Sequence, residues 1–123
     1  MERHIRIKAG SVTAVAELFN TKTAEAIWQA LPFSNKVNIW RDEIYCGIPA
    51  KTELEAGQEI VNFGELGYWP PESAFCIFFG PTPASNKSEI RDASAVDIFG
   101  KIVGDALVFK DVEDGERIVV ERV

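Results

Sequence analysis

Hydrophobic and polar residues alternate from the start of the chain. In residues 3–8, Ile5 and Ile7 are separated by charged or polar positions, and residues 11–19 continue the same alternation. A period of two is typical of a strand with one buried face. The short Ala-Gly link between the two runs therefore predicts a β-hairpin.

The period changes in "NTKTAEAIWQALP", residues 20–32. Apolar residues now recur at the spacing i, i+3, i+4, i+7, which predicts one buried stripe of a short α-helix: Ala24, Ile27, Trp28 and Leu31. Asn20 or Thr21 can cap the first turn, and Pro32 ends the helix. So short a helix is marginal in isolation, so its apolar stripe is expected to cover an open end of a barrel.

Six further short runs have strand character: residues 36–40, 42–48, 58–63, 74–79, 96–103 and 117–123. Glycines and prolines separate most of them, and residues 104–115 could form a second short helix. With the first hairpin, this makes about eight strands. The pattern predicts a mainly β chain, a closed eight-stranded antiparallel barrel with two short helices, because closure removes exposed strand edges. A length of 123 residues fits a single domain, 1–123.

Charge and hydropathy narrow the function classes. Nineteen Asp and Glu residues against thirteen Lys and Arg give a formal charge of −6, so nucleic acid is not an expected partner. No apolar run is long enough to span a membrane. The first ten residues lack the apolar region of a secretory signal, so we expect a cytoplasmic protein that is a monomer or homodimer.

The chain offers few metal ligands of the kind that zinc prefers. It has two cysteines, Cys46 and Cys76, thirty residues apart, and one histidine, His4. A structural zinc site needs about four N or S ligands, and no calcium-loop or phosphate-loop motif is present. We therefore predict no metal and no cofactor, and we interpret the two cysteines as small buried residues.

Three motifs carry a resemblance to a known family. "TKTAEAIWQAL" resembles the first helix of cyclophilins, and "DIFGKIVGDALVFKDV" resembles their Val-Phe-Gly-Lys-Val segment with its following helix. "GYWPPESAFCIFFGPTPAS" is similar to a signature of the small prokaryotic cyclophilin-like proteins. The resemblance covers nearly the whole chain and implies the cyclophilin barrel, although that branch has no settled biochemical activity.

The resemblance breaks at the positions that matter for prolyl isomerase activity. Matching "IYCGIP" to the family's strand puts Cys46 where cyclophilins carry their catalytic Arg, and Cys76 falls where a Phe forms the proline pocket. A thiol cannot supply the donors of a guanidinium. We therefore expect peptidyl-prolyl isomerase activity to be absent or very weak, unless another arginine such as Arg41 or Arg91 reaches the groove.

Strand parity divides the aromatic segment at residues 74–79. Phe75, Ile77 and Phe79 share one face and Ala74, Cys76 and Phe78 share the other; the family match makes the first face core and the second face groove. Tyr68 and Trp69 precede two prolines in an expected turn. They form either a binding rim or a plug at one end of the barrel, and the plug is the simpler interpretation.

These observations favour a non-catalytic binding module. Its ligand would be a proline-containing peptide or a small apolar molecule, bound in a groove lined by Cys46, Ile48, Tyr68, Trp69, Cys76 and Phe78. Two alternatives remain: a weak peptidyl-prolyl isomerase, and, by family analogy, a subunit of a metabolic enzyme complex.

Overall fold

The computed structural model describes residues 3–123, and strands dominate this part of the chain. Ten strands are present there: β1 (Arg3–Ala9), β2 (Val12–Leu18), β3 (Phe33–Lys36), β4 (Asn38–Ile39), β5 (Glu43–Gly47), β6 (Gln58–Val61), β7 (Glu65–Trp69), β8 (Ala74–Phe78), β9 (Ile90–Val103) and β10 (Arg117–Arg122). The prediction of a mainly β protein is confirmed. Among these described residues, no helix has the length and apolarity to cross a membrane.

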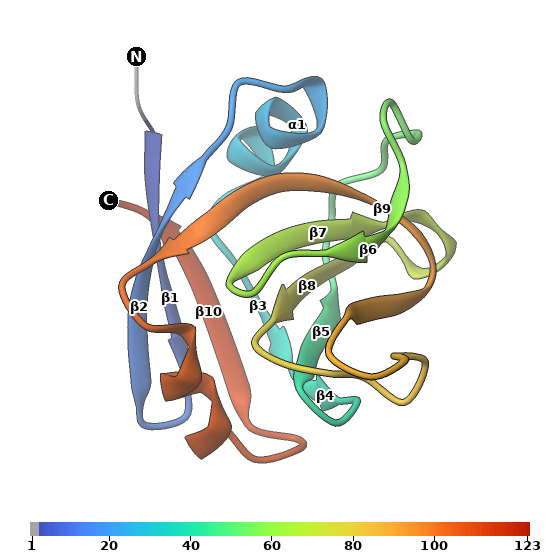
Figure 1. Cartoon of the computed structure of the whole chain (residues 1–123). Helices are drawn as coiled ribbons and strands as arrows, with labels where there is room; N and C mark the ends of the chain where they lie inside the picture. The colour runs from blue at the N-terminus through green and yellow to red at the C-terminus, as the bar shows by residue number, and fades with distance from the viewer. Residues whose placement is uncertain (1–2) are drawn as a thin grey trace.

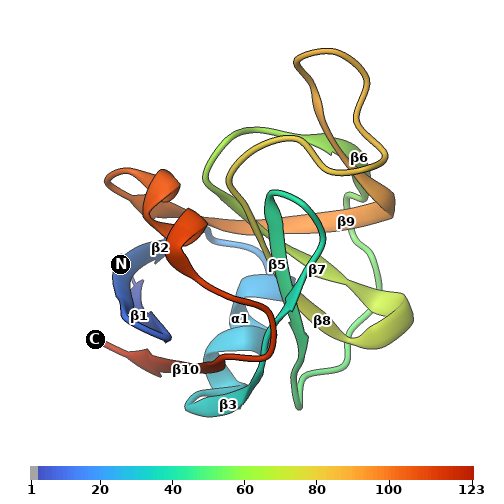
Figure 2. The same cartoon turned by 90° about the horizontal axis from the view of Figure 1, so that it is seen from below.

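The strands pair in the order β3-β10-β1-β2-β9-β7-β8-β5-β4, and β6 adds to β9. Every ladder is antiparallel, and the strands surround an apolar interior (Figure 2). The predicted closed barrel is not confirmed, because no backbone ladder joins the two ends of this order. β3 pairs with β10, whereas β4 pairs with β5. Between β3 and β5, the side chain of Asn35 donates to the carbonyl of Gly47 at 2.9 Å.

Helices lie at opposite ends of the strands in Figure 1, with the α-helix α1 (Lys22–Ala30) at the top and the 3₁₀-helix η2 (Ala106–Asp111) at the bottom. Thr21 caps α1 by accepting a hydrogen bond from the Ala24 amide at 3.0 Å. Ala24 and Ile27 are buried as the periodicity predicts. η2 falls inside the region expected to form the second helix.

Apolar side chains form two clusters on opposite faces of β8. Phe75, Ile77 and Phe79 belong to the large interior core, and the opposite face of the strand belongs to a smaller cluster beneath β6. The predicted parity of this strand is therefore confirmed. The smaller cluster consists of Val61, Ala74, Cys76, Phe78, Ile90 and Val96.

The expected turn at Tyr68 and Trp69 is wrong, because both residues belong to strand β7. The turn comes later, in the 3₁₀-helix η1 (Pro70–Glu72). Gly67 misled the prediction: it lies inside β7, where a Cβ atom would approach the Phe78 ring to 3.1 Å. This glycine makes room for a buried ring rather than breaking the strand.

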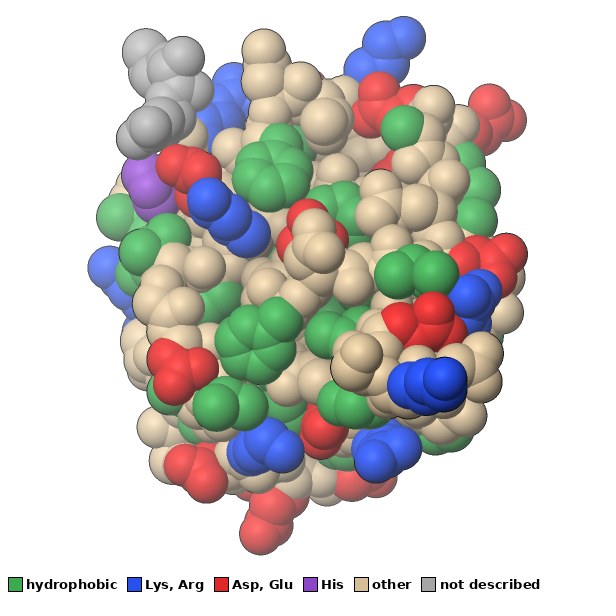
Figure 3. All heavy atoms as spheres, in the orientation of Figure 1, with side chains coloured by type: hydrophobic (Ala, Val, Ile, Leu, Met, Phe, Trp, Pro, Cys, Tyr) green, Lys and Arg blue, Asp and Glu red, His purple; other side chains and the backbone are tan. Residues whose placement is uncertain are grey.

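Charged side chains of both signs are interspersed on the face shown in Figure 3. Lys and Arg lie among Asp and Glu there, and apolar groups fill the spaces between them. This face carries no extended patch of one sign. Surface charge therefore marks no site on this face.

Candidate functional site

The six residues predicted to line a groove divide between the two faces of the sheet. Cys46, Ile48 and Tyr68 belong to the interior core, whereas Cys76, Phe78 and Trp69 belong to or pack against the smaller cluster. In the β5–β8 ladder, Cys46 pairs with Phe75 and Tyr45 pairs with Cys76. Directly paired residues share a face, so the expectation that both cysteines face one groove is wrong.

A hollow lies on the outer face of β5, β7 and β9, the face that carries Trp69 and Cys76. The hollow has a volume of about 100 Å³. Trp69 lies at its edge, and its indole Nε1 donates to the hydroxyl of Ser94 at 2.6 Å. Trp40, Glu43, Tyr45, Trp69, Glu72, Asp92 and Ala93 line this hollow, which we call the acidic pocket.

The floor of the acidic pocket holds two buried carboxyl groups. Glu43 begins β5 and is 2% exposed, and Asp92 near the start of β9 is 4% exposed. Apart from the other carboxyl group of the pair, Oε1 of Glu43 and Oδ2 of Asp92 have no hydrogen-bond partner in the described chain. The Cys76 sulfur lies with them, since one ligand atom of each of the three residues falls within 4.8 Å of the others.

The two carboxyl groups titrate as a pair. Burial raises the pKa of Glu43 to about 9, and a hydrogen bond with Asp92 and repulsion by its charge add to the rise. Burial also raises the pKa of Asp92, although its hydrogen bonds with Glu43 and the Ala93 amide oppose this. Near neutral pH the pair therefore shares one proton and keeps one negative charge.

The thiols are poor nucleophiles in these surroundings. Burial raises the pKa of Cys46 to about 12. The pKa of Cys76 is raised well above its ordinary value by burial first and then by the neighbouring Glu43 and Asp92. Because the thiolate is the reactive form, neither cysteine is prepared for nucleophilic catalysis.

The acidic pocket can do two things chemically. Its remaining negative charge can hold a cation, because no Lys or Arg is among the lining residues of the described chain. Protonated Glu43 can also share its proton with a bound group, as carboxyl pairs with separated pKa values do. Arg91, which could have supplied a guanidinium, instead forms ion pairs with Glu59 at 3.1 Å and Glu89 at 3.0 Å.

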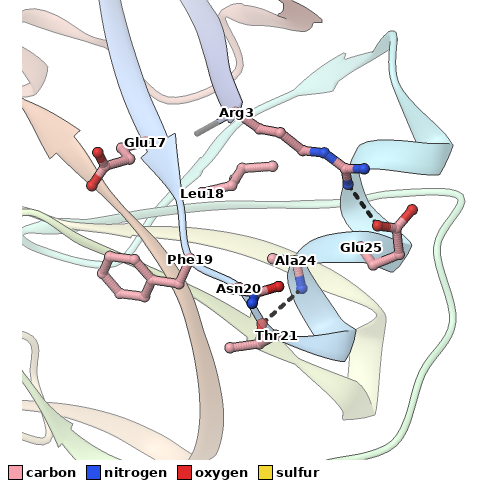
Figure 4. A pocket seen from close by; sticks show the side chains of 8 residues that line it. All are labelled: Arg3, Glu17, Leu18, Phe19, Asn20, Thr21, Ala24 and Glu25. Atoms are coloured by element: carbon pink, nitrogen blue, oxygen red, sulfur yellow. Dashed lines mark hydrogen bonds and ion pairs between the residues drawn. The ribbon is translucent and has the colours of Figure 1, made fainter. Parts of the chain in front are cut away.

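A larger hollow lies between the end of β2 and α1 (Figure 4). Its volume is about 680 Å³. Two pairs form among its polar groups: Arg3 with Glu25 at 2.6 Å, and Thr21 with the Ala24 amide. With no buried unpaired group among the described residues that line it, this hollow is a weaker candidate than the acidic pocket.

Glu43, Asp92, Trp40 and Tyr45 were missed at the level of sequence. One signal was available: Glu43 and Tyr45 fall on the same face of an otherwise apolar strand, "EIYCGI". A carboxylate among the buried residues of a strand indicates that a partner group lies nearby, because Asp and Glu are rarely buried without one. Its partner Asp92 could not be found this way, because the predicted strand began only at residue 96.

Strand pairing and the position of its helices place this chain in the cyclophilin-like class of β proteins. A family model described as cyclophilin-like matches residues 3–121, so the chain belongs to the cyclophilin-like family. It is also similar to a hypothetical protein from Archaeoglobus fulgidus whose structure was solved in solution. The two share 40% sequence identity and a TM-score of 0.86, over 99% of this chain and 95% of the archaeal one. No curated protein matches the chain.

Proposed function

We propose that this protein is a non-catalytic binding module whose acidic pocket takes a small ligand or one end of a peptide. The observation that supports this proposal most is the buried pair Glu43 and Asp92, which borders a hollow whose lining holds no Lys or Arg of the described chain. Burying a charge without a partner costs stability. A bound ligand would offset that cost.

The walls of the acidic pocket also favour binding. Trp40, Tyr45 and Trp69 bring three aromatic rings to a hollow of about 100 Å³, and tryptophan and tyrosine are enriched where proteins bind partners. Only one of the six groove residues predicted from sequence, Trp69, lines this pocket, and Cys76 lies beneath it. The binding site proposed here is therefore shifted from the one that the sequence indicated.

Prolyl isomerase activity is a weaker proposal. The barrier to imide rotation is about 20 kcal/mol, and lowering it requires groups that stabilise the twisted imide more than the planar one. The lining of the acidic pocket brings carboxyl groups but no guanidinium within the described chain. Cys46 occupies the position that was matched to the catalytic Arg, but its side chain faces the interior core. A side chain at that position would therefore not reach a ligand in the acidic pocket.

A ligand screen by NMR tests the binding proposal. Cationic, neutral and anionic fragments and Ala-Pro peptides would be added to ¹⁵N-labelled protein at millimolar concentration. We expect amide shifts confined to residues 40–45, 69–72 and 92–94, which surround the acidic pocket. A screen with no shifts there, or with shifts only at the hollow between β2 and α1, would contradict the proposal.

A further inference from the structure

We propose that the acidic pocket binds an organic ammonium cation, most tightly a methylated one, in contact with the rings of Trp40, Tyr45 and Trp69 and with the carboxyl groups of Glu43 and Asp92. This inference rests on the proposed binding function and names the class of ligand. It goes beyond that function because the first proposal also admits a neutral ligand that donates hydrogen bonds to the two carboxyl groups.

Charge is the first argument. Three of the seven lining residues carry a carboxyl group, Glu43, Glu72 and Asp92, and none carries a positive charge in the described chain. Arg91 is adjacent to Asp92 in β9, so its side chain points to the opposite face, where Glu59 and Glu89 bind it. The described residues therefore bring no cation into the lining of the acidic pocket.

The aromatic rings are the second argument. Trp and Tyr faces attract cations, and rings grouped around a small space recognise methylated ammonium groups. The described chain shows this interaction at another tryptophan: Arg3 and Arg122 lie over the Trp28 ring at 5.0 and 4.5 Å. The rings of Trp40 and Trp69, which line the acidic pocket, have no cation–π contact with a side chain of the described residues.

Size and donor set distinguish an ammonium group from a metal ion. A hollow of about 100 Å³ suits the head group of a small amine better than a whole metabolite. A metal ion could use oxygen atoms of Glu43 and Asp92 and the sulfur of Cys76, which lie within 4.8 Å of one another. It would make no use of the three rings, and it would require the Cys76 thiol to lose its proton against an environment that opposes this.

Binding is expected to release a proton. The groups that face Glu43 are Asp92 on β9, Cys76 on β8, Tyr45 on β5 and Glu72 in η1. None of them is cationic, so a bound ammonium group would be the first positive charge near Glu43 and would favour its ionised form. Affinity should therefore rise as the pH increases from about 7 toward about 9, the pKa of Glu43 in the free protein.

A matched pair of probes tests the class of ligand. Choline carries a trimethylammonium group, and 3,3-dimethylbutan-1-ol has the same shape without the charge. Both would be titrated into ¹⁵N-labelled protein at low ionic strength, with readout at residues 40–45, 69–72 and 92–94. We expect choline to bind there at least about tenfold more tightly than the alcohol, since removing the charge removes the cation–π and carboxylate attraction together.

Variants assign the binding to the named groups. Asp92→Asn and Trp69→Leu should each weaken choline binding by about tenfold, whereas Trp69→Phe, which keeps a ring, should retain most of it. Trp28→Leu and Glu53→Gln remove a tryptophan and an exposed carboxyl outside the pocket and should leave choline binding unchanged. Thermal melts would confirm that each variant is folded before its affinity is compared.

Three outcomes overturn the ammonium proposal: equal binding of choline and the alcohol, choline binding that Asp92→Asn does not weaken, and binding of Zn²⁺ or Mn²⁺ at the pocket without binding of choline, methylammonium or tetramethylammonium. If only neutral or anionic fragments bind at the pocket, the binding function stands and the ligand class is wrong. If no fragment binds there, both proposals fail.

Discussion

Three carboxyl groups are buried in the described chain, and their surroundings differ. Asp97 is 2% exposed, and its oxygens accept hydrogen bonds from the Thr23 hydroxyl at 3.0 Å and from the amides of Glu55 and Ala56 at 2.9 and 3.0 Å. Glu43 and Asp92 are equally buried, yet each has an oxygen with no hydrogen-bond partner in the described chain other than the second carboxyl group of the pair. Buried polar groups are normally satisfied. This difference supports a structural role for Asp97 and the proposed ligand-binding role for the other two.

Glu43→Gln tests the buried acid through the stability of the fold. The raised pKa means that, between about pH 4.5 and 9, the folded protein holds a proton that the unfolded chain has lost. The free energy of unfolding of the natural protein should therefore fall as pH rises through this window, by up to about 1.4 kcal/mol per pH unit. Glutamine cannot ionise, so urea denaturation of the variant should show a smaller fall.

The control for this experiment is Glu53→Gln, which removes an exposed carboxyl group and should leave the pH dependence of the natural protein in place. Parallel curves for Glu43→Gln and the natural protein would mean that Glu43 ionises in the folded state as it does in the unfolded chain. The electrostatic basis of the pocket would then be lost.

At the scale of elements, one carboxylate connects a loop, a helix and a strand. Asp97 on β9 binds Thr23 in the first turn of α1 and two amides of the segment that leads to β6. Glu55 adds a second link by accepting from the Thr23 amide at 2.9 Å. These hydrogen bonds hold α1 over one end of the interior core. They also fix residues 55 and 56, which belong to no strand.

Asp97→Ala should lower the free energy of unfolding by about 2 to 3 kcal/mol, because it leaves a buried hydroxyl and two amides without an acceptor. Hydrogen exchange should show faster exchange of the Glu55 and Ala56 amides in particular. The comparison variant is Asp114→Ala, which removes an exposed carboxylate that accepts one hydrogen bond from the Ile39 amide at 2.9 Å. Its cost should stay below about 1 kcal/mol, and an equal cost for the two variants would contradict the role given to Asp97.

Local patterns in the sequence predicted most elements and missed those that depend on distant contacts. The apolar stripe of α1 and the alternation in β1, β2 and β8 depend on side chains a few residues apart, so the local sequence was sufficient to predict these elements. β7 was missed because Gly67 was interpreted as a turn residue. The reason for a glycine inside the strand is the close packing of Phe78 and Val96 against it, which the local sequence does not show. The beginning of β9 was missed because Asp92 and Ser94 interrupt its apolar pattern. Asp92 lines the acidic pocket, and the Ser94 hydroxyl accepts a hydrogen bond from the Trp69 indole.

At the scale of the whole molecule, the site forms where four segments meet. Residues 40–45, the end of β7, η1 and the first part of β9 contribute to the acidic pocket, and no single stretch of sequence contains more than three of its lining residues. The family resemblance predicted a mainly β chain of the cyclophilin-like kind, but the predicted barrel closure is not confirmed, and the groove on one face of β8 stays a prediction. It could not predict the pocket, since that depends on carboxyl groups that no motif in the sequence brought together.

The two-faced packing of β8 explains how one fold carries both stability and a site. Its interior face contributes Phe75 and Ile77 to the large core, while Cys76 on the other face supports the acidic pocket from below. The interior core can therefore hold the strands in place while the outer face keeps groups that would be costly in a purely structural role. We infer that these groups are kept for a cation.

The most direct test of that claim is a pH titration of the side-chain carboxyl groups by ¹³C NMR, from about pH 4 to about pH 10, with and without choline. In the free protein, Glu43 should titrate with a midpoint near 9, and choline should lower that midpoint because its charge favours the ionised pair. Ordinary titration of both Glu43 and Asp92 in the free protein, or a Glu43 midpoint that saturating choline leaves in place, would contradict the account.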